Sequence, residues 1–119
     1  MIDRGFADRF AAEWVAAWNA HDLPRVLAHY AEDFEMASPR IVNVAGEPSG
    51  RLRGKPAVAA YWAKAMSGGP SLHFEPLEVL LGADGLALRY RNHHGQTAVE
   101  TFEFDKDRKV VRAAAYYSS

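Results

Sequence analysis

Hydrophobic and polar residues alternate along the second half of the chain in a way that predicts β-strands. In residues 98–104, Ala98, Glu100, Phe102 and Phe104 fall on one face of an extended chain, and the intervening residues fall on the other. The same period of two runs through residues 72–81, 86–92 and 110–117, with turns at 83–85 and 93–96. These four segments therefore predict a meander of antiparallel strands.

The first part of the chain has a helical period instead. Residues 3–20 are predicted to form a helix with one stripe made of Phe6, Phe10, Trp14, Ala17, Trp18 and His21. A short second helix is predicted after Asp22, which is a good N-cap, with Leu23, Val26, Leu27 and Tyr30 on its buried side. A third helix is predicted over residues 55–66, with Val58, Trp62, Ala65 and Met66 inward and Ser67-Gly68-Gly69-Pro70 ending it.

Two segments between these helices have a different pattern. Residues 34–38 alternate like a strand, with Phe34, Met36 and Ser38 on one face, and residues 39–54 are predicted to be a loop. A loop of that length in a small domain often forms the rim of a site. Pro76 indicates a bulge or a sheet edge within 72–81, because proline cannot donate a ladder hydrogen bond. Helices followed by strands indicate one α+β domain over residues 1–119, with the helices against one face of a curved sheet.

Composition narrows the function classes. A net charge of −1 excludes the basic stripe that a nucleic-acid partner requires, and no segment has the apolar length of a membrane span. The absence of cysteine excludes thiolate chemistry, and no two of the five histidines have the helical spacing of a metal site. We therefore expect a soluble, cytoplasmic protein with no metal or organic cofactor.

Glu100 is the main anomaly in this pattern, because it places a carboxylate between apolar residues on a core-facing strand. One interpretation is a pocket carboxyl whose pKa is raised by burial, so that it can donate or accept a proton. The other is a structural glutamate satisfied by an arginine or by hydroxyl groups. A charged and unpartnered carboxylate at this position would be costly, so the side chain must be protonated, paired or hydrated.

The stretches WNAHDLPRVLAHYAEDFEMASP and VETFEFDKDRKVVRAAAYYSS, with a Gly-Lys-Pro helix start between them, resemble the NTF2-like superfamily. Within it, the chain is most similar to the branch of SnoaL-like polyketide cyclases and ketosteroid isomerases. The resemblance implies a cone-shaped α+β barrel, in which three helices close over a strongly curved antiparallel sheet around an apolar pocket. It further implies a small hydrophobic ligand, polyketide-like or steroid-like, and a homodimer formed through the outer face of the sheet.

The same resemblance assigns three positions to catalysis. Glu100 falls on the position of a protonated aspartic acid, Trp14 on that of a tyrosine that helps to form the oxyanion hole, and Ser38 on that of the basic aspartate. Serine is not a base at neutral pH, and tryptophan retains only an N–H donor. The isomerase reaction is therefore not expected to be inherited, although Glu100 itself is retained as a homologue.

Two functions follow, and the sequence leaves both open. The first is an acid–base isomerase or cyclase in which Glu100 moves a proton and His73, or a residue of 39–53, supplies the base. The second is a non-catalytic module that binds a ligand or assembles through its sheet. In both, the predicted ligand-binding residues are Trp18, Tyr30, Met36, Trp62, Met66, Asn92, Phe102 and Tyr117. A second titratable group near Glu100 would favour the enzyme.

Overall fold

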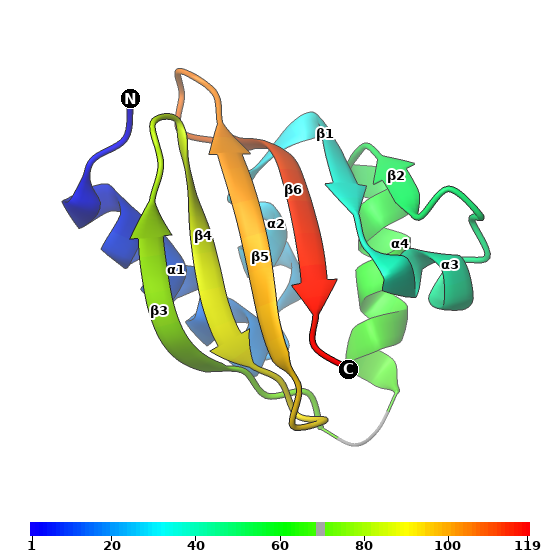
Figure 1. The fold of residues 1–119 in the computed structure, drawn as a ribbon. Coiled ribbons are helices and arrows are strands. Elements are labelled where there is room, and N and C mark those ends of the chain that lie inside the picture. Colours follow the sequence, from blue (N-terminus) through cyan, green and yellow to red (C-terminus); the bar gives the residue numbers. More distant parts are fainter. Residues whose placement is uncertain (69–70) are drawn as a thin grey trace.

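The arrangement of the chain is a curved six-stranded sheet with helices packed against one of its faces (Figure 1). A computed structural model describes residues 1–68 and 71–119. The helices are α1 (Arg4–Asn19), α2 (Leu23–Leu27), α3 (Pro39–Val44) and α4 (Lys55–Ser67). The strands are β1 (Tyr30–Ala37), β2 (Arg51–Arg53), β3 (Glu75–Leu81), β4 (Gly85–Arg91), β5 (Thr97–Phe104) and β6 (Val110–Tyr117). None of the described helices is long and apolar enough to cross a membrane.

Short polar side chains fix where three of these helices begin. Asp3 accepts a hydrogen bond from the backbone N–H of Phe6 at 2.8 Å, and Asp22 accepts one from Arg25 at 3.2 Å. Ser38 does the same for α3, where its Oγ accepts from the N–H of Arg40 at 3.2 Å. Each cap satisfies one backbone donor that has no partner within the helix.

The strands lie in the order β2-β1-β6-β5-β4-β3. Neighbouring strands pair antiparallel except β1 and β6, which are parallel, with Met36 opposite Ala113. The expectation of a wholly antiparallel sheet is therefore wrong at this pair. The strand that comes last in the sequence lies inside the sheet, between the first strand and the hairpins that precede it.

Burial confirms the predicted faces of the strands. Along β5, Ala98, Glu100, Phe102 and Phe104 are buried, and along β4 the buried residues are Leu86, Leu88 and Tyr90. Edge-on aromatic contacts join this face to α1, where the ring centroid of Phe10 lies 5.0 Å from that of Phe102. The Pro76 prediction is also confirmed, since β3 is an edge strand whose register shifts between Pro76 and Glu78.

Five predicted features differ from the structure. Residues 39–54 are not a continuous loop, because they contain α3 and β2, and the helices number four among the described residues instead of three. Tyr30 begins β1 and does not belong to the second helix, which ends at Leu27. The strand predicted from residue 72 begins at Glu75. The helix predicted over 55–66 ends at Ser67, and the predicted stop at Gly69-Pro70 lies outside the described residues.

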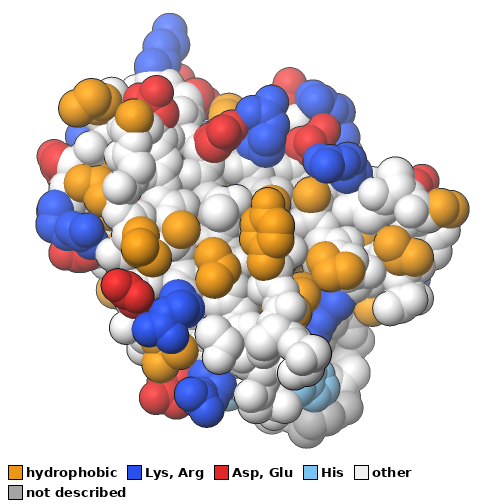
Figure 2. All heavy atoms as spheres, viewed as in Figure 1, with side chains coloured by type: hydrophobic (Ala, Val, Ile, Leu, Met, Phe, Trp, Pro, Cys, Tyr) orange, Lys and Arg blue, Asp and Glu red, His pale blue; other side chains and the backbone are white. Residues whose placement is uncertain are grey.

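The face of the sheet that turns away from the helices carries exposed apolar side chains (Figure 2). Tyr116 is 59% exposed and stands opposite Val99 on the neighbouring strand. Leu80 is 46% exposed and stands opposite Ala87. Charged side chains, including the Arg112–Glu103 and Arg89–Glu78 ion pairs, flank this apolar band. We call this surface the outer face.

Candidate functional site

A cavity of about 50 Å³ lies between the helices and the inner face of the sheet. Its apolar wall is mainly aromatic and includes Trp14, Trp18, Tyr61, Trp62, Phe74 and Tyr90. The polar side chains that reach it are Arg40, Asn92, His93, Glu100 and Tyr117. Stacked and tilted contacts hold the wall in place, for example Trp14 against Phe74 with ring centroids 5.6 Å apart. The cavity thus combines a rigid apolar lining with a few polar groups, which is the usual composition of a small-molecule site.

Glu100 projects into this cavity from the middle of β5 and is 4% exposed. The hydroxyl of Tyr90, on the adjacent strand β4, donates a hydrogen bond to its Oε1 at 3.1 Å. Burial raises the pKa of the Glu100 carboxyl to about 8, and the Tyr90 hydrogen bond opposes that rise only in part. The carboxyl is therefore mostly protonated at pH 7. Because no described residue bonds to Oε2, its acidic proton is available to a ligand.

Four tyrosines surround this carboxyl and stay protonated. Burial raises the pKa values of Tyr30, Tyr61, Tyr90 and Tyr117, and a negative charge on Glu100 would raise each of them further. Their hydroxyl groups therefore act as hydrogen-bond donors and acceptors in the physiological pH range. Glu100 is the group in this cluster that titrates closest to neutrality.

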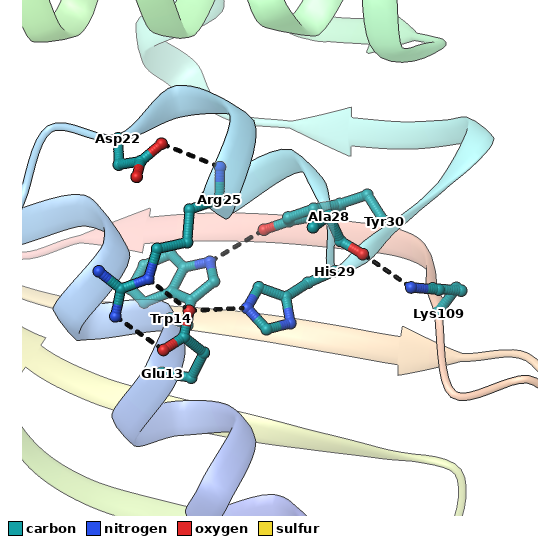
Figure 3. A network of polar contacts seen from close by, with 8 residues as sticks. All are labelled: Glu13, Trp14, Asp22, Arg25, Ala28, His29, Tyr30 and Lys109. Atoms are coloured by element: carbon teal, nitrogen blue, oxygen red, sulfur yellow. Dashed lines mark hydrogen bonds and ion pairs between the residues drawn. The ribbon is translucent and has the colours of Figure 1, made fainter.

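The N–H of Trp14 is already used within the protein. Its Nε1 donates to the hydroxyl of Tyr30 at 2.9 Å, and both side chains are buried (Figure 3). Trp14 therefore contributes its ring to the cavity wall, while Tyr30 lies behind that wall. This bond leaves Trp14 without a free donor for the supporting role that its sequence position suggests.

Ser38 lies at the start of α3 and is absent from the cavity lining. Its Oγ accepts the hydrogen bond from the backbone of Arg40, so the structure gives it a capping role. His73, the residue considered as a base, is exposed to solvent and does not reach the cavity.

Of the predicted ligand-binding residues, Trp18, Met36, Trp62, Asn92 and Tyr117 line the cavity. Tyr30, Met66 and Phe102 do not: Met66 packs partly buried against the core, and Phe102 packs edge-on against Phe10. The geometry brings the first group together around Glu100 and leaves the second in supporting positions.

Four polar residues of the site were not predicted as site residues: Tyr61, Tyr90, Arg40 and His93. Tyr90 lies in the alternating segment 86–92, so the period of two was the signal that could have placed it. Tyr61 had a visible signal, since it is three residues after Val58 and shares the inward face of α4 with Trp62. Arg40 is not predicted as a site residue because it falls in the predicted loop of residues 39–54, and His93 is not predicted because it falls in the predicted turn of residues 93–96. His93 Nδ1 and Trp18 Nε1 are buried and have no hydrogen-bond partner among the described residues. Such groups in a cavity wall favour a ligand that supplies the missing partner.

A second polar network lies outside the cavity and joins α1 to α2 (Figure 3). Arg25 donates two hydrogen bonds of 2.8 Å to the carboxylate of Glu13, which is the bidentate geometry of a strong ion pair. The Arg25 contact lowers the pKa of Glu13, and burial lowers the pKa of His29, whose Nε2 is 3.7 Å from Glu13 Oε2. No cluster of three or more His, Asp or Glu side chains among residues 1–68 and 71–119 is arranged to hold a metal ion.

Comparisons with known proteins agree with this architecture. The model of the SnoaL-like domain matches residues 11–117. A SnoaL-like protein of unknown function from Burkholderia thailandensis is 53% identical, with a TM-score of 0.95 over 99% of this chain and 98% of the other. No curated protein matches the sequence.

Two more distant structures show the fold alone. IdmH, a proposed polyketide cyclase from Streptomyces antibioticus, is 17% identical, with a TM-score of 0.77 over 94% of this chain and 91% of the other. A proposed ketosteroid isomerase from Kribbella flavida is 16% identical, with a TM-score of 0.70 over 92% of this chain and 75% of the other. The α+β fold expected from the sequence is thereby confirmed.

Proposed function

From the premise that this chain belongs to the SnoaL-like domain family, we propose that it is an acid–base enzyme acting on a small, apolar, carbonyl-bearing molecule. The observation that carries the proposal is a buried carboxyl at a cavity wall with a pKa near neutrality. Groups with such pKa values suit proton transfer at physiological pH. The cavity holds about 50 Å³, so only one end of the ligand, such as its carbonyl group, enters it.

The proposed step is an enolisation. The free proton of Glu100 moves to the carbonyl oxygen of the ligand as negative charge develops there, which leaves a neutral enol and the Glu100 carboxylate. A proton leaves the adjacent carbon at the same time. His93 lines the same cavity, and its imidazole is the candidate acceptor of that proton. Burial lowers the pKa of His93, which favours the neutral imidazole that a base requires.

Deuterium exchange into phenylacetone, followed by NMR in D₂O, tests this step. The wild-type protein should accelerate exchange of the hydrogens next to the carbonyl, and Glu100→Gln should abolish the acceleration while phenylacetone still raises the melting temperature. Glu103→Gln is the matched control, since Glu103 lies on the same strand but on its exposed face. Exchange that equals the buffer rate, or that survives in Glu100→Gln, would refute the acid–base role.

A second function is favoured by the outer face, and we propose that this face joins two copies of the chain. Its support is the exposed apolar band of Leu80, Ala87, Val99 and Tyr116, flanked by ion pairs. Bands of this kind on a sheet are typical of interfaces. Light scattering should give the mass of a dimer for the wild type and for Lys106→Glu, and the mass of a monomer for Tyr116→Glu. A monomeric wild type would reject the dimer without affecting the proposal for the cavity.

A further inference from the structure

A larger hollow of about 220 Å³ adjoins the cavity and opens toward α4 and the turn after β4. The two spaces share Arg40, Tyr61, Ala65, Leu72 and His93 in their walls. Because of this shared wall, a ligand in the inner cavity would extend through the hollow toward solvent. We call this space the entrance hollow.

The entrance hollow is lined by basic side chains. Arg40, Lys64, His93 and His94 line it, and its described lining includes no aspartate or glutamate. In the inner cavity, Glu100 is the one acid of the described lining, and it is mostly protonated at pH 7. The electrostatic environment along this path therefore favours an anion.

Arg40 is central to this environment, because its charge has no counter-ion among the described residues. Its Nη2 donates to the neutral amide oxygen Oε1 of Gln96 at 2.7 Å, and its Cζ lies 4.4 Å from the ring centroid of Tyr117. No carboxylate of the described residues lies within ion-pair distance of it, whereas Arg25 and Arg112 each contact a glutamate. A partly buried guanidinium without a counter-charge bears a desolvation cost that a bound anion would offset.

The position of Arg40 is also fixed. Its backbone N–H donates to the capping Oγ of Ser38, and its guanidinium is held between the Tyr117 ring and the Gln96 amide. A guanidinium presents five N–H donors, and the bond to Gln96 leaves an edge that matches the two oxygens of one carboxylate. Ordering this edge in advance reduces the entropy lost on binding.

We propose that Arg40 binds the carboxylate of the ligand, so that the site takes small apolar carboxylic acids whose apolar part lies in the entrance hollow and points toward Glu100. This inference rests on the proposed ligand-binding function of the cavity and names the chemical class of the ligand. One guanidinium suits a monoanion, and the apolar wall beyond it suits a ring.

Calorimetric titration with phenylacetate and with its neutral analogue phenylacetamide tests the inference. Phenylacetate should bind the wild type about tenfold or more tightly than phenylacetamide, as expected for one charge-assisted hydrogen-bonded pair. Arg40→Gln should remove this preference, and Arg40→Lys should retain part of it. Arg9→Gln is the control, because Arg9 is exposed on α1, does not line the cavity, and its loss changes the net charge equally.

The outcomes separate this inference from the proposed function. If phenylacetamide binds as tightly as phenylacetate, or if Arg9→Gln weakens phenylacetate as much as Arg40→Gln, the role of Arg40 is refuted while ligand binding in the cavity stands. If neither compound binds the wild type, both proposals fail. Circular dichroism spectra of the variants should match that of the wild type. A match shows that a variant which no longer prefers phenylacetate is still folded.

Discussion

Replacing Glu100 by glutamine should change how the stability of the protein depends on pH. The pKa of this carboxyl rises from 4.5 in the unfolded chain to about 8 in the fold, because burial disfavours its charged form. Between these two values the folded protein holds a proton that the unfolded chain has lost. The free energy of unfolding therefore falls as pH rises, by about 1.4 kcal/mol for each pH unit. Across the whole interval the loss amounts to about 5 kcal/mol.

Urea denaturation of the wild type and Glu100→Gln from pH 5 to pH 9, at one protein concentration, measures this effect. The other titrating groups are common to both proteins, so they largely cancel in the difference between the two unfolding free energies. Glutamine does not titrate, and its amide oxygen can still accept the hydrogen bond of Tyr90. We therefore expect the unfolding free energy of Glu100→Gln minus that of the wild type to rise by several kcal/mol between about pH 5 and pH 8.5. Above about pH 8.5 this difference should change little.

A constant difference over this pH range would refute the reasoning. It would mean that the carboxyl ionises in the fold as easily as in water, through hydration or through movement of the side chain. The matched variant Glu103→Gln should show no such pH dependence, because Glu103 lies on the exposed face of the same strand. A rise in relative stability at high pH for Glu103→Gln as well would trace the effect to net charge instead of burial.

Two further predictions concern the contacts in Figure 3. Tyr30→Phe should lower the free energy of unfolding by about 1–3 kcal/mol in urea, because it leaves the buried N–H of Trp14 without an acceptor; an equal loss in the exposed Tyr116→Phe would contradict this. Glu13→Gln should lower the pKa of His29 in an NMR titration, because the Glu13 charge opposes the effect of burial on that imidazole. An unchanged or higher pKa for His29 would show that Glu13 does not act on it.

The strand faces could be predicted because the sheet is covered on one side only. Each strand of the meander buries alternate residues, so the period of two assigns Phe102 and Phe104 to the core, where both are buried. Glu100 was identified as unusual by the same rule, since it broke the apolar pattern on that face. The prediction that this carboxyl must be protonated, paired or hydrated agrees with the structure, where it is buried and accepts a hydrogen bond from Tyr90.

The elements around residues 39–54 could not be predicted in the same way. α3 has six residues and β2 has three, which is too short for either period to repeat. Arg40 therefore had no assigned position, although it lies in the cavity wall. Tyr30 was misplaced because its spacing from Val26 fits a helix, whereas the short helix after Asp22 ends before it and the chain becomes extended. The parallel pairing of β1 with β6 depends on contacts between distant segments, which no local pattern encodes.

The position of β6 inside the sheet has a consequence for folding kinetics. The meander of β3, β4, β5 and β6 is built from neighbouring segments, whereas β1 with β2 joins it only through β6, as when Tyr30 meets Val110. The long segment between β1 and β6 has to close into a loop before these two strands can pair, and this closure costs conformational entropy. We therefore expect the docking of β1 onto β6 to limit the folding rate. Until it occurs, the β1-facing edge of β6 is unpaired and open to the same strand of another copy. We therefore expect variants that weaken the pairing of β1 with β6 to form domain-swapped or aggregated species. This should occur even where the stability of the rest of the sheet is unchanged.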